Sequence, residues 1–114
     1  MQVAPDEAHG PRAQIQRQDT RSYCVHGAMT FDSVIDLWRQ SADMFSGETV
    51  LRIDLAQVTH TDSAGLALLV EWMREASRRG ARIDFLHLPA QMLALADAAN
   101  LEQALVGKRG SATS

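Results

Sequence analysis

Cysteine is almost absent from this chain, which has a single one, Cys24, among 114 residues. One thiol cannot form a disulfide within a chain, so the reducing cytosol is the expected setting. Aromatic residues make up only 5% of the sequence, but 46% of the residues are hydrophobic, which is enough for one domain with a core. We expect Cys24 to be a buried, inert thiol within a strand.

Long apolar runs and basic stripes are missing as well. The longest nearly apolar run, residues 64–70, is far shorter than the roughly 20 residues that span a bilayer, and residues 1–12 lack the apolar centre of a signal peptide. The net charge is −3, and no stripe of Lys and Arg indicates a nucleic-acid partner. Metal-ligand spacings, a nucleophile elbow and a Walker sequence are not found, so we expect no metal, no cofactor and no enzymatic activity.

Composition divides the chain into one domain and two tails. Residues 1–12 contain two prolines and a glycine without periodicity, and residues 107–114 are rich in glycine, serine and threonine. Both segments are therefore expected to be flexible tails. Residues 13–106 between them are expected to form the folded domain.

Hydrophobic periodicity predicts strands that alternate with helices. Two short strands over residues 14–18 and 21–26, separated by Asp19-Thr20, are predicted to form a hairpin. The remaining predicted elements are a helix over 30–44, a strand over 50–55, a helix over 63–79, a strand over 81–88, and helices over 89–100 and 101–106. Short links between them imply parallel pairing with right-handed crossovers. The expected fold is α/β, a small mixed sheet of about four strands covered by helices, in the order β-β-α-β-α-β-α-α.

The helix predicted over residues 30–44 has apolar residues at the spacing of one helical face. Thr30 is predicted to cap its N-terminus. The stripe predicted to face the core consists of Phe31, Val34, Ile35 and Trp38.

Six residues, Thr61-Asp62-Ser63-Ala64-Gly65-Leu66, lie where the loop predicted over 56–62 meets the long helix. The N-terminus of a helix exposes unpaired N–H groups and the positive end of the helix dipole. Ser63 in this place can cap the helix, offer its hydroxyl to a partner, or accept a phosphate, and Asp62 can be the cap instead. Ala64 and Gly65 leave little side chain on the first turn, where either the sheet or the backbone of a partner can approach.

A helical wheel separates two apolar sets on the long helix. The predicted core stripe consists of Leu66, Leu69, Val70, Met73 and Ala76. Leu68 and Trp72 fall on a charged flank, beside Glu75 and Arg79. Two large apolar residues one turn apart on such a flank predict either a contact surface for a partner or a neighbouring helix that covers them.

The run Asp62-Ser63-Ala64-Gly65-Leu66, after a strand and before a helix that ends at Gly80, resembles the STAS domain family over about residues 14–106. Within that family the chain is similar to the small STAS subunits of the Mla phospholipid-transport ABC systems of bacteria. This similarity is carried by Gly27 with the following Leu37-Trp38, by Ile53-Asp54-Leu55 leading into Val58-Thr59-His60-Thr61-Asp62-Ser63, by Gly65-Leu66-Ala67-Leu68-Leu69 and by residues 88–101. Those subunits typically have Thr where this chain has Ser63, whereas anti-sigma factor antagonists usually have Ser.

The resemblance implies a non-enzymatic accessory subunit of an ABC transporter that maintains lipid asymmetry. Such a subunit is cytoplasmic, is associated with the inner membrane only through its complex, and binds the ATPase subunit away from the nucleotide site. The residues expected to bind this partner, from the resemblance and the wheel together, are Thr61, Asp62, Ser63, Ala64, Gly65, Leu68 and Trp72. The alternative is an anti-sigma factor antagonist, in which phosphorylation of Ser63 by a partner kinase blocks partner binding.

Overall fold

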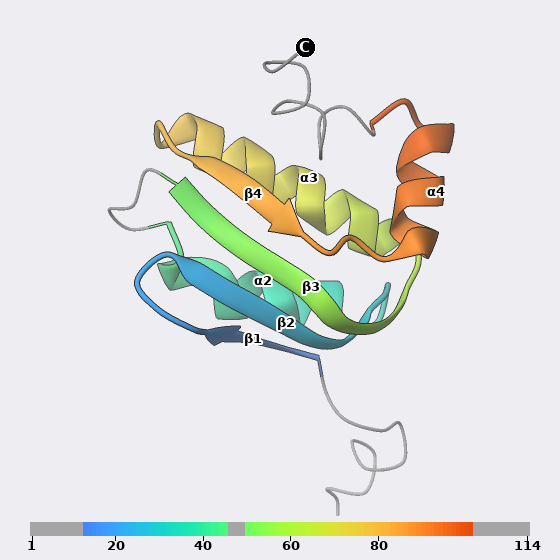
Figure 1. The fold of residues 1–114 in the computed structure, drawn as a ribbon, viewed down its shortest axis with the longest axis horizontal. Helices are drawn as coiled ribbons and strands as arrows, with labels where there is room; N and C mark the ends of the chain where they lie inside the picture. Colours follow the sequence, from blue (N-terminus) through green and yellow to red (C-terminus); the bar gives the residue numbers. More distant parts are fainter. Residues whose placement is uncertain (1–12, 46–49, 102–114) are drawn as a thin grey trace, which may run out of the picture.

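Four strands form one sheet, α2 and α3 lie on one of its faces, and α4 stands at its end beside α3 (Figure 1). The computed structural model describes residues 13–45 and 50–101, so both predicted tails and nearly all of the helix predicted over 101–106 lie outside the described residues. The elements are β1 (Gln14–Arg17), β2 (Ser22–Met29), α2 (Val34–Gln40), the 3-10 helix η1 (Ser41–Asp43), β3 (Val50–Thr61), α3 (Ser63–Arg78), β4 (Arg82–Leu86) and α4 (Ala90–Ala98). The predicted fold class and the order of these elements are confirmed.

The sheet has the strand order β1-β2-β3-β4. β1 and β2 form the predicted antiparallel hairpin. β2 pairs in parallel with β3, and β3 pairs in parallel with β4. Each parallel pair is connected through a helix, α2 in the first case and α3 in the second, and these two helices contact each other. The carboxyl end of β3 therefore leads directly into α3, at the edge where open α/β sheets commonly carry their binding sites.

β3 is six residues longer than predicted, since it continues from residue 55 to Thr61. The pairing of β2 with β3 shifts register twice, between Cys24 and His26 and again between Gly27 and Ala28, and each shift adds one residue to β3. Every extra residue reverses the alternation between the two faces of the sheet. The sequence consequently loses its period of two in a segment that is still a strand, and the prediction of a loop over 56–62 is wrong.

α2 begins later than predicted and buries a different face. Regular helix begins at Val34 rather than after Thr30, and the residue at its N-cap position is Ser33, so the prediction of Thr30 as the cap is wrong. Leu37 is fully buried. Three of the four residues predicted to face the core are instead exposed, namely Phe31, Ile35 and Trp38. Because Phe31 precedes the helix, the spacing read from the sequence does not describe one helical face.

The exposed flank predicted on α3 is wrong, because Leu68 is 5% and Trp72 0% exposed. The indole Nε1 of Trp72 donates a hydrogen bond of 2.9 Å to the Oγ of Ser41, which lies in η1. The alternative, that a neighbouring helix covers these residues, is confirmed. α4 packs on α3 as well. More of the circumference of α3 is buried than the single predicted stripe, because α3 contacts α2 and α4 as well as the sheet.

Gly65 and Gly80 shape the two ends of α3. A Cβ at position 65 would collide with the Thr61 hydroxyl and lie 2.5 Å from the Met29 carbonyl oxygen, so glycine allows α3 to approach the sheet. Gly80 ends the helix, as predicted, with a φ of +75°. Its amide donates to the Ser77 carbonyl and the next amide, Ala81, donates to the Ala76 carbonyl, the pattern of a glycine-terminated helix.

The hydrogen bond between Trp72 and Ser41 can be tested by removing its acceptor. We expect Ser41→Ala to lower the free energy of unfolding by about 1–3 kcal/mol, because a buried N–H group loses its partner. Urea denaturation measures this change. The control is Ser77→Ala, at an exposed serine of α3, the helix that carries Trp72, and its free energy of unfolding is expected to stay within about 0.5 kcal/mol of the wild type. Equal stability of Ser41→Ala and Ser77→Ala would contradict the role given to this bond.

Candidate functional site

The candidate site is the N-terminus of α3, which the carboxylate of Asp62 positions. Its Oδ1 accepts hydrogen bonds from the amides of Ala64 at 2.8 Å and Gly65 at 3.4 Å. Asp62 is therefore the N-cap, as one of the two interpretations of the sequence held, and Ser63 is the first helical residue. The other oxygen, Oδ2, accepts from the amide of Phe31 at 3.2 Å. One side chain thus joins the first turn of α3 to the turn between β2 and α2.

Thr61 lies beneath this junction rather than on its surface. Its side chain is fully buried, and its hydroxyl donates to the Met29 carbonyl oxygen at 3.0 Å. Its amide donates to the Oε1 of Gln91, in α4, at 3.5 Å. The Thr61 side chain therefore offers no atom to a partner, contrary to the expectation for a binding residue. It holds together the ends of β2 and β3 below the start of α3.

Ser63 is exposed, and it stands at the positive end of the α3 dipole. Since Asp62 supplies the cap, the Ser63 hydroxyl is available to a partner or to a modifying group. Ala64 is half-buried, and Gly65 is buried against the sheet. The glycine at position 65 thus makes room for the protein's own β2 and β3 rather than for a partner. Ser63 is the most accessible residue of the predicted motif.

An apolar surface begins near Ser63 and consists of residues that the sequence pattern predicts to lie in the core. Phe31 is 79%, Ile35 60% and Trp38 39% exposed. We call these three residues the α2 stripe. The sequence does contain a signal for the correct face. Leu37 is followed four residues later by Ser41, and both are fully buried, so this competing face, rather than the α2 stripe, is the one that packs inward.

Two titratable groups away from α3, Asp54 and Cys24, have shifted pKa values. Partial burial opposes the ionisation of Asp54, but hydrogen bonds from the Ala56 amide at 2.9 Å and with the His87 ring at 3.0 Å hold the pKa of its carboxyl below the usual value. Burial, helped by the negative charge of Asp54, raises the pKa of the Cys24 thiol. Cys24 is buried, as predicted. Within residues 13–45 and 50–101, no three His, Cys, Asp or Glu side chains are grouped to hold a metal ion.

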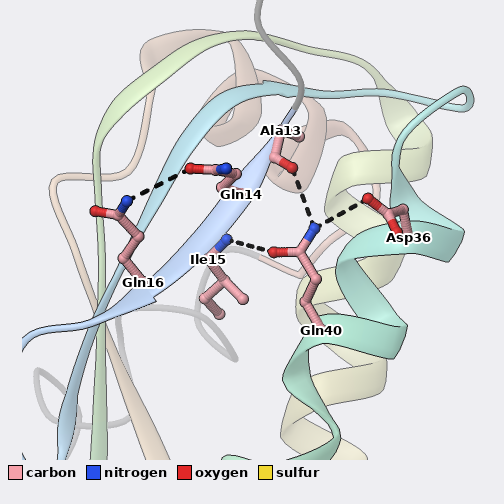
Figure 2. Close-up of a pocket in the computed structure, with 6 residues that line it drawn as sticks. All are labelled: Ala13, Gln14, Ile15, Gln16, Asp36 and Gln40. Atoms are coloured by element: carbon pink, nitrogen blue, oxygen red, sulfur yellow. Dashed lines mark hydrogen bonds between the residues drawn. The ribbon is translucent and has the colours of Figure 1, made fainter. Parts of the chain in front are cut away.

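An open pocket between β1 and α2 is shown in Figure 2. The Oε1 of Gln40 accepts from the Ile15 amide at 2.9 Å, and its Nε2 donates to the Ala13 carbonyl oxygen at 3.2 Å and to Asp36 at 3.0 Å. The side-chain amide of Gln40 therefore pairs with the outer edge of β1 as the peptide group of another strand would. The polar groups of Gln40 thus protect the edge of the sheet and are already hydrogen-bonded within the protein. This pocket is therefore a weaker candidate for a binding site than the N-terminus of α3.

Comparison with known proteins agrees with this geometry. The family described as "Mlab, STAS domain" matches residues 17–107. The "Intermembrane phospholipid transport system binding protein MlaB" of Haemophilus influenzae is 26% identical over 86 residues, which are 72% of this chain and 82% of that protein. The chain belongs to the STAS domain family, as its sequence motif predicts.

Two solved structures share the fold. The unphosphorylated anti-sigma factor antagonist SpoIIAA is 20% identical, with a TM-score of 0.58 over 73% of this chain and 79% of that one. A structure of Mglu is 22% identical, with a TM-score of 0.55 over 68% of this chain, and the chain spans only 19% of its length. In the described ranges, no helix combines the length and the apolar character that crossing a membrane requires.

The assignment of the cap to Asp62 predicts a contrast between two neighbouring substitutions. We expect Asp62→Ala to lower the free energy of unfolding by about 1–2 kcal/mol, because three amides lose their acceptor. Ser63→Ala, the matched control, is expected to change it by less than about 0.5 kcal/mol, since position 63 is exposed. Both values come from urea denaturation. A larger loss in Ser63→Ala than in Asp62→Ala would show that Ser63 is the cap.

Proposed function

We propose that this protein is a non-enzymatic accessory subunit of a bacterial phospholipid-transporting ABC system that maintains lipid asymmetry. It binds the cytoplasmic ATPase subunit of that system through the surface around Ser63. In this role the protein is cytoplasmic and is associated with the inner membrane only through the complex. The named function of the Haemophilus influenzae relative and the family of the chain both support the proposal.

The observation that carries the proposal is the exposed Ser63 on a helix end of fixed position. Asp62 binds the first turn of α3 and the β2–α2 turn, so neither segment needs to become ordered when a partner arrives. A preformed surface binds more tightly than a flexible one, because less conformational entropy is lost. The hydroxyl of Ser63 can then donate to or accept from a polar group of the ATPase without a change in the fold.

The same position gives the interface a means of control. A phosphate on Ser63 would add about −1.5 to −2 charges. The N-terminus of α3 tolerates the added charge, because the positive end of the helix dipole offsets its repulsion from the neighbouring Asp62 carboxylate. A partner surface packed on the hydroxyl would have to bury that charge, which opposes binding. Phosphorylation of Ser63 is therefore compatible with folding and incompatible with a close contact.

A second candidate function, the anti-sigma factor antagonist, is supported by the same exposed hydroxyl. A protein kinase that modifies Ser63 needs this side chain accessible, as it is here. The likeness to SpoIIAA is 20% in identity and concerns the fold. The two candidates differ in their partner, an ABC-transporter ATPase in one case and a serine kinase that holds a sigma factor in the other.

Substitution of Ser63 by a charged residue tests the proposal. We expect the purified ATPase subunit of the host's phospholipid-transport ABC system to bind the wild-type chain, and to bind Ser63→Asp at least about tenfold more weakly, because a buried charge replaces a neutral hydroxyl. Ser63→Asp should remain folded, since a carboxylate favours a helix N-terminus. Surface-immobilised ATPase and a titration of each variant give the dissociation constants.

The matched control is Ser77→Asp, at an exposed serine near the other end of α3. It should bind the ATPase as the wild type does. Full binding by Ser63→Asp would remove Ser63 from the interface. A wild-type chain that does not bind the ATPase, but does bind and become phosphorylated by a kinase, would favour the second candidate.

A further inference from the structure

The α2 stripe is the largest unexplained feature of the surface. Phe31, Ile35 and Trp38 are the three large hydrophobic residues that the described part of the chain exposes. Ile35 and Trp38 are three residues apart and lie on one side of α2, and Phe31 lies in the turn that leads from β2 into this helix. Single exposed apolar residues need no explanation, but a contiguous set of this size marks a contact site in many proteins.

The Phe31 end of the α2 stripe is held near Ser63 by hydrogen bonds. The Phe31 amide donates to the same Asp62 carboxylate that caps α3. The turn is fixed from its other side too, because the Ser33 hydroxyl donates to the Ala28 carbonyl oxygen at 2.7 Å and accepts from the Thr30 amide at 2.9 Å. These bonds fix the β2–α2 turn, which carries Phe31, against the Ser63 end of α3, and α2 with Ile35 and Trp38 follows directly from this turn.

We propose that the α2 stripe is the apolar centre of the surface that binds the ATPase subunit, with Ser63 at its rim. This inference rests on the proposed function and extends it to residues outside the family's sequence motif. The contact region of the ATPase is then expected to be apolar, with basic side chains beside it. Large aromatic side chains at the centre of an interface carry much of the binding energy, and polar groups surround them.

Charge favours a basic partner over a second copy of this chain. Asp32, which follows Phe31, is exposed and places a negative charge at that end of the α2 stripe, and residues 31–43 as a whole contain three aspartates and one basic residue. A symmetric dimer through the α2 stripe would bring two such acidic segments together, and like charges across an interface oppose association. A partner with Lys or Arg beside its apolar residues would be attracted to the same segment.

The α2 stripe is too small to form a protein interface alone, so an interface there would have to include neighbouring residues. A standard protein interface buries about 800 Å² on each partner, whereas three partly exposed side chains supply only a few hundred Å² at most. The neighbouring Ser63 end of α3 is the continuation that the Asp62 hydrogen bonds provide. One partner covering both regions accounts for the exposed hydroxyl and the exposed apolar residues together.

Removal of the apolar side chains tests the inference with the full-length protein and the purified ATPase subunit. We expect the double variant Phe31→Ser, Ile35→Ser to bind the ATPase at least about thirtyfold more weakly than the wild type. Both residues are mostly exposed, so Tm should change by less than about 4 °C. Asp32→Lys should also weaken binding, whereas Asp97→Lys, at an exposed aspartate of α4, is the matched control expected to bind normally.

The outcomes separate this inference from the proposed function. If the wild type binds the ATPase and Ser63→Asp weakens binding, while the double variant binds as the wild type does, the α2 stripe is not in the interface and this inference alone is overturned. A wild-type chain that does not bind the ATPase overturns both. A wild-type dimer in light scattering, which the double variant converts to a monomer without loss of ATPase binding, assigns the stripe to a second copy and also overturns this inference.

Discussion

The Asp62 carboxylate is the contact on which the candidate surface depends, because its two oxygens hold segments about thirty residues apart in the chain. One oxygen caps α3 and the other accepts from the amide of Phe31. Beneath it, the buried Thr61 hydroxyl binds the end of β2, and Gly65 leaves the space that brings α3 close to the sheet. Ser63 and the Phe31 end of the α2 stripe are therefore positioned by the half-buried Asp62 and by the buried Thr61 and Gly65.

The apolar residues of the two helices that cover the sheet have opposite roles. α3 places Leu68 and Trp72 inside the protein, where Trp72 donates its N–H to Ser41. α2 is seven residues long and fully buries one of them, Leu37. A short helix with a narrow buried face leaves its other apolar residues outside. The surface that we propose for a partner is therefore on α2 and at the start of α3, since the flank of α3 formed by Leu68 and Trp72 is buried.

Local rules predicted those parts of the fold that depend on a few neighbouring residues. The hairpin around Asp19-Thr20 and the end of α3 at Gly80 follow from turn and capping preferences, and Asp62 was one of two capping residues considered. The last six residues of β3 were missed, because two bulges against β2 disrupt the alternation and the partner strand is not visible in the sequence. The exposure of Trp38 was not predicted, and the burial of Trp72 was one of two alternatives, since a helical wheel does not show which neighbours cover a helix.

Hydrogen–deuterium exchange of the chain, alone and bound to the purified ATPase subunit, tests most directly whether the partner covers this preformed surface. Amide exchange reports local opening and contact along the whole chain in one experiment. The account predicts that binding slows exchange in residues 31–38 and at the first turn of α3, with little change in β1 and β4. Slower exchange confined to β1 or β4, with residues 31–38 and 63–65 unchanged, would contradict it.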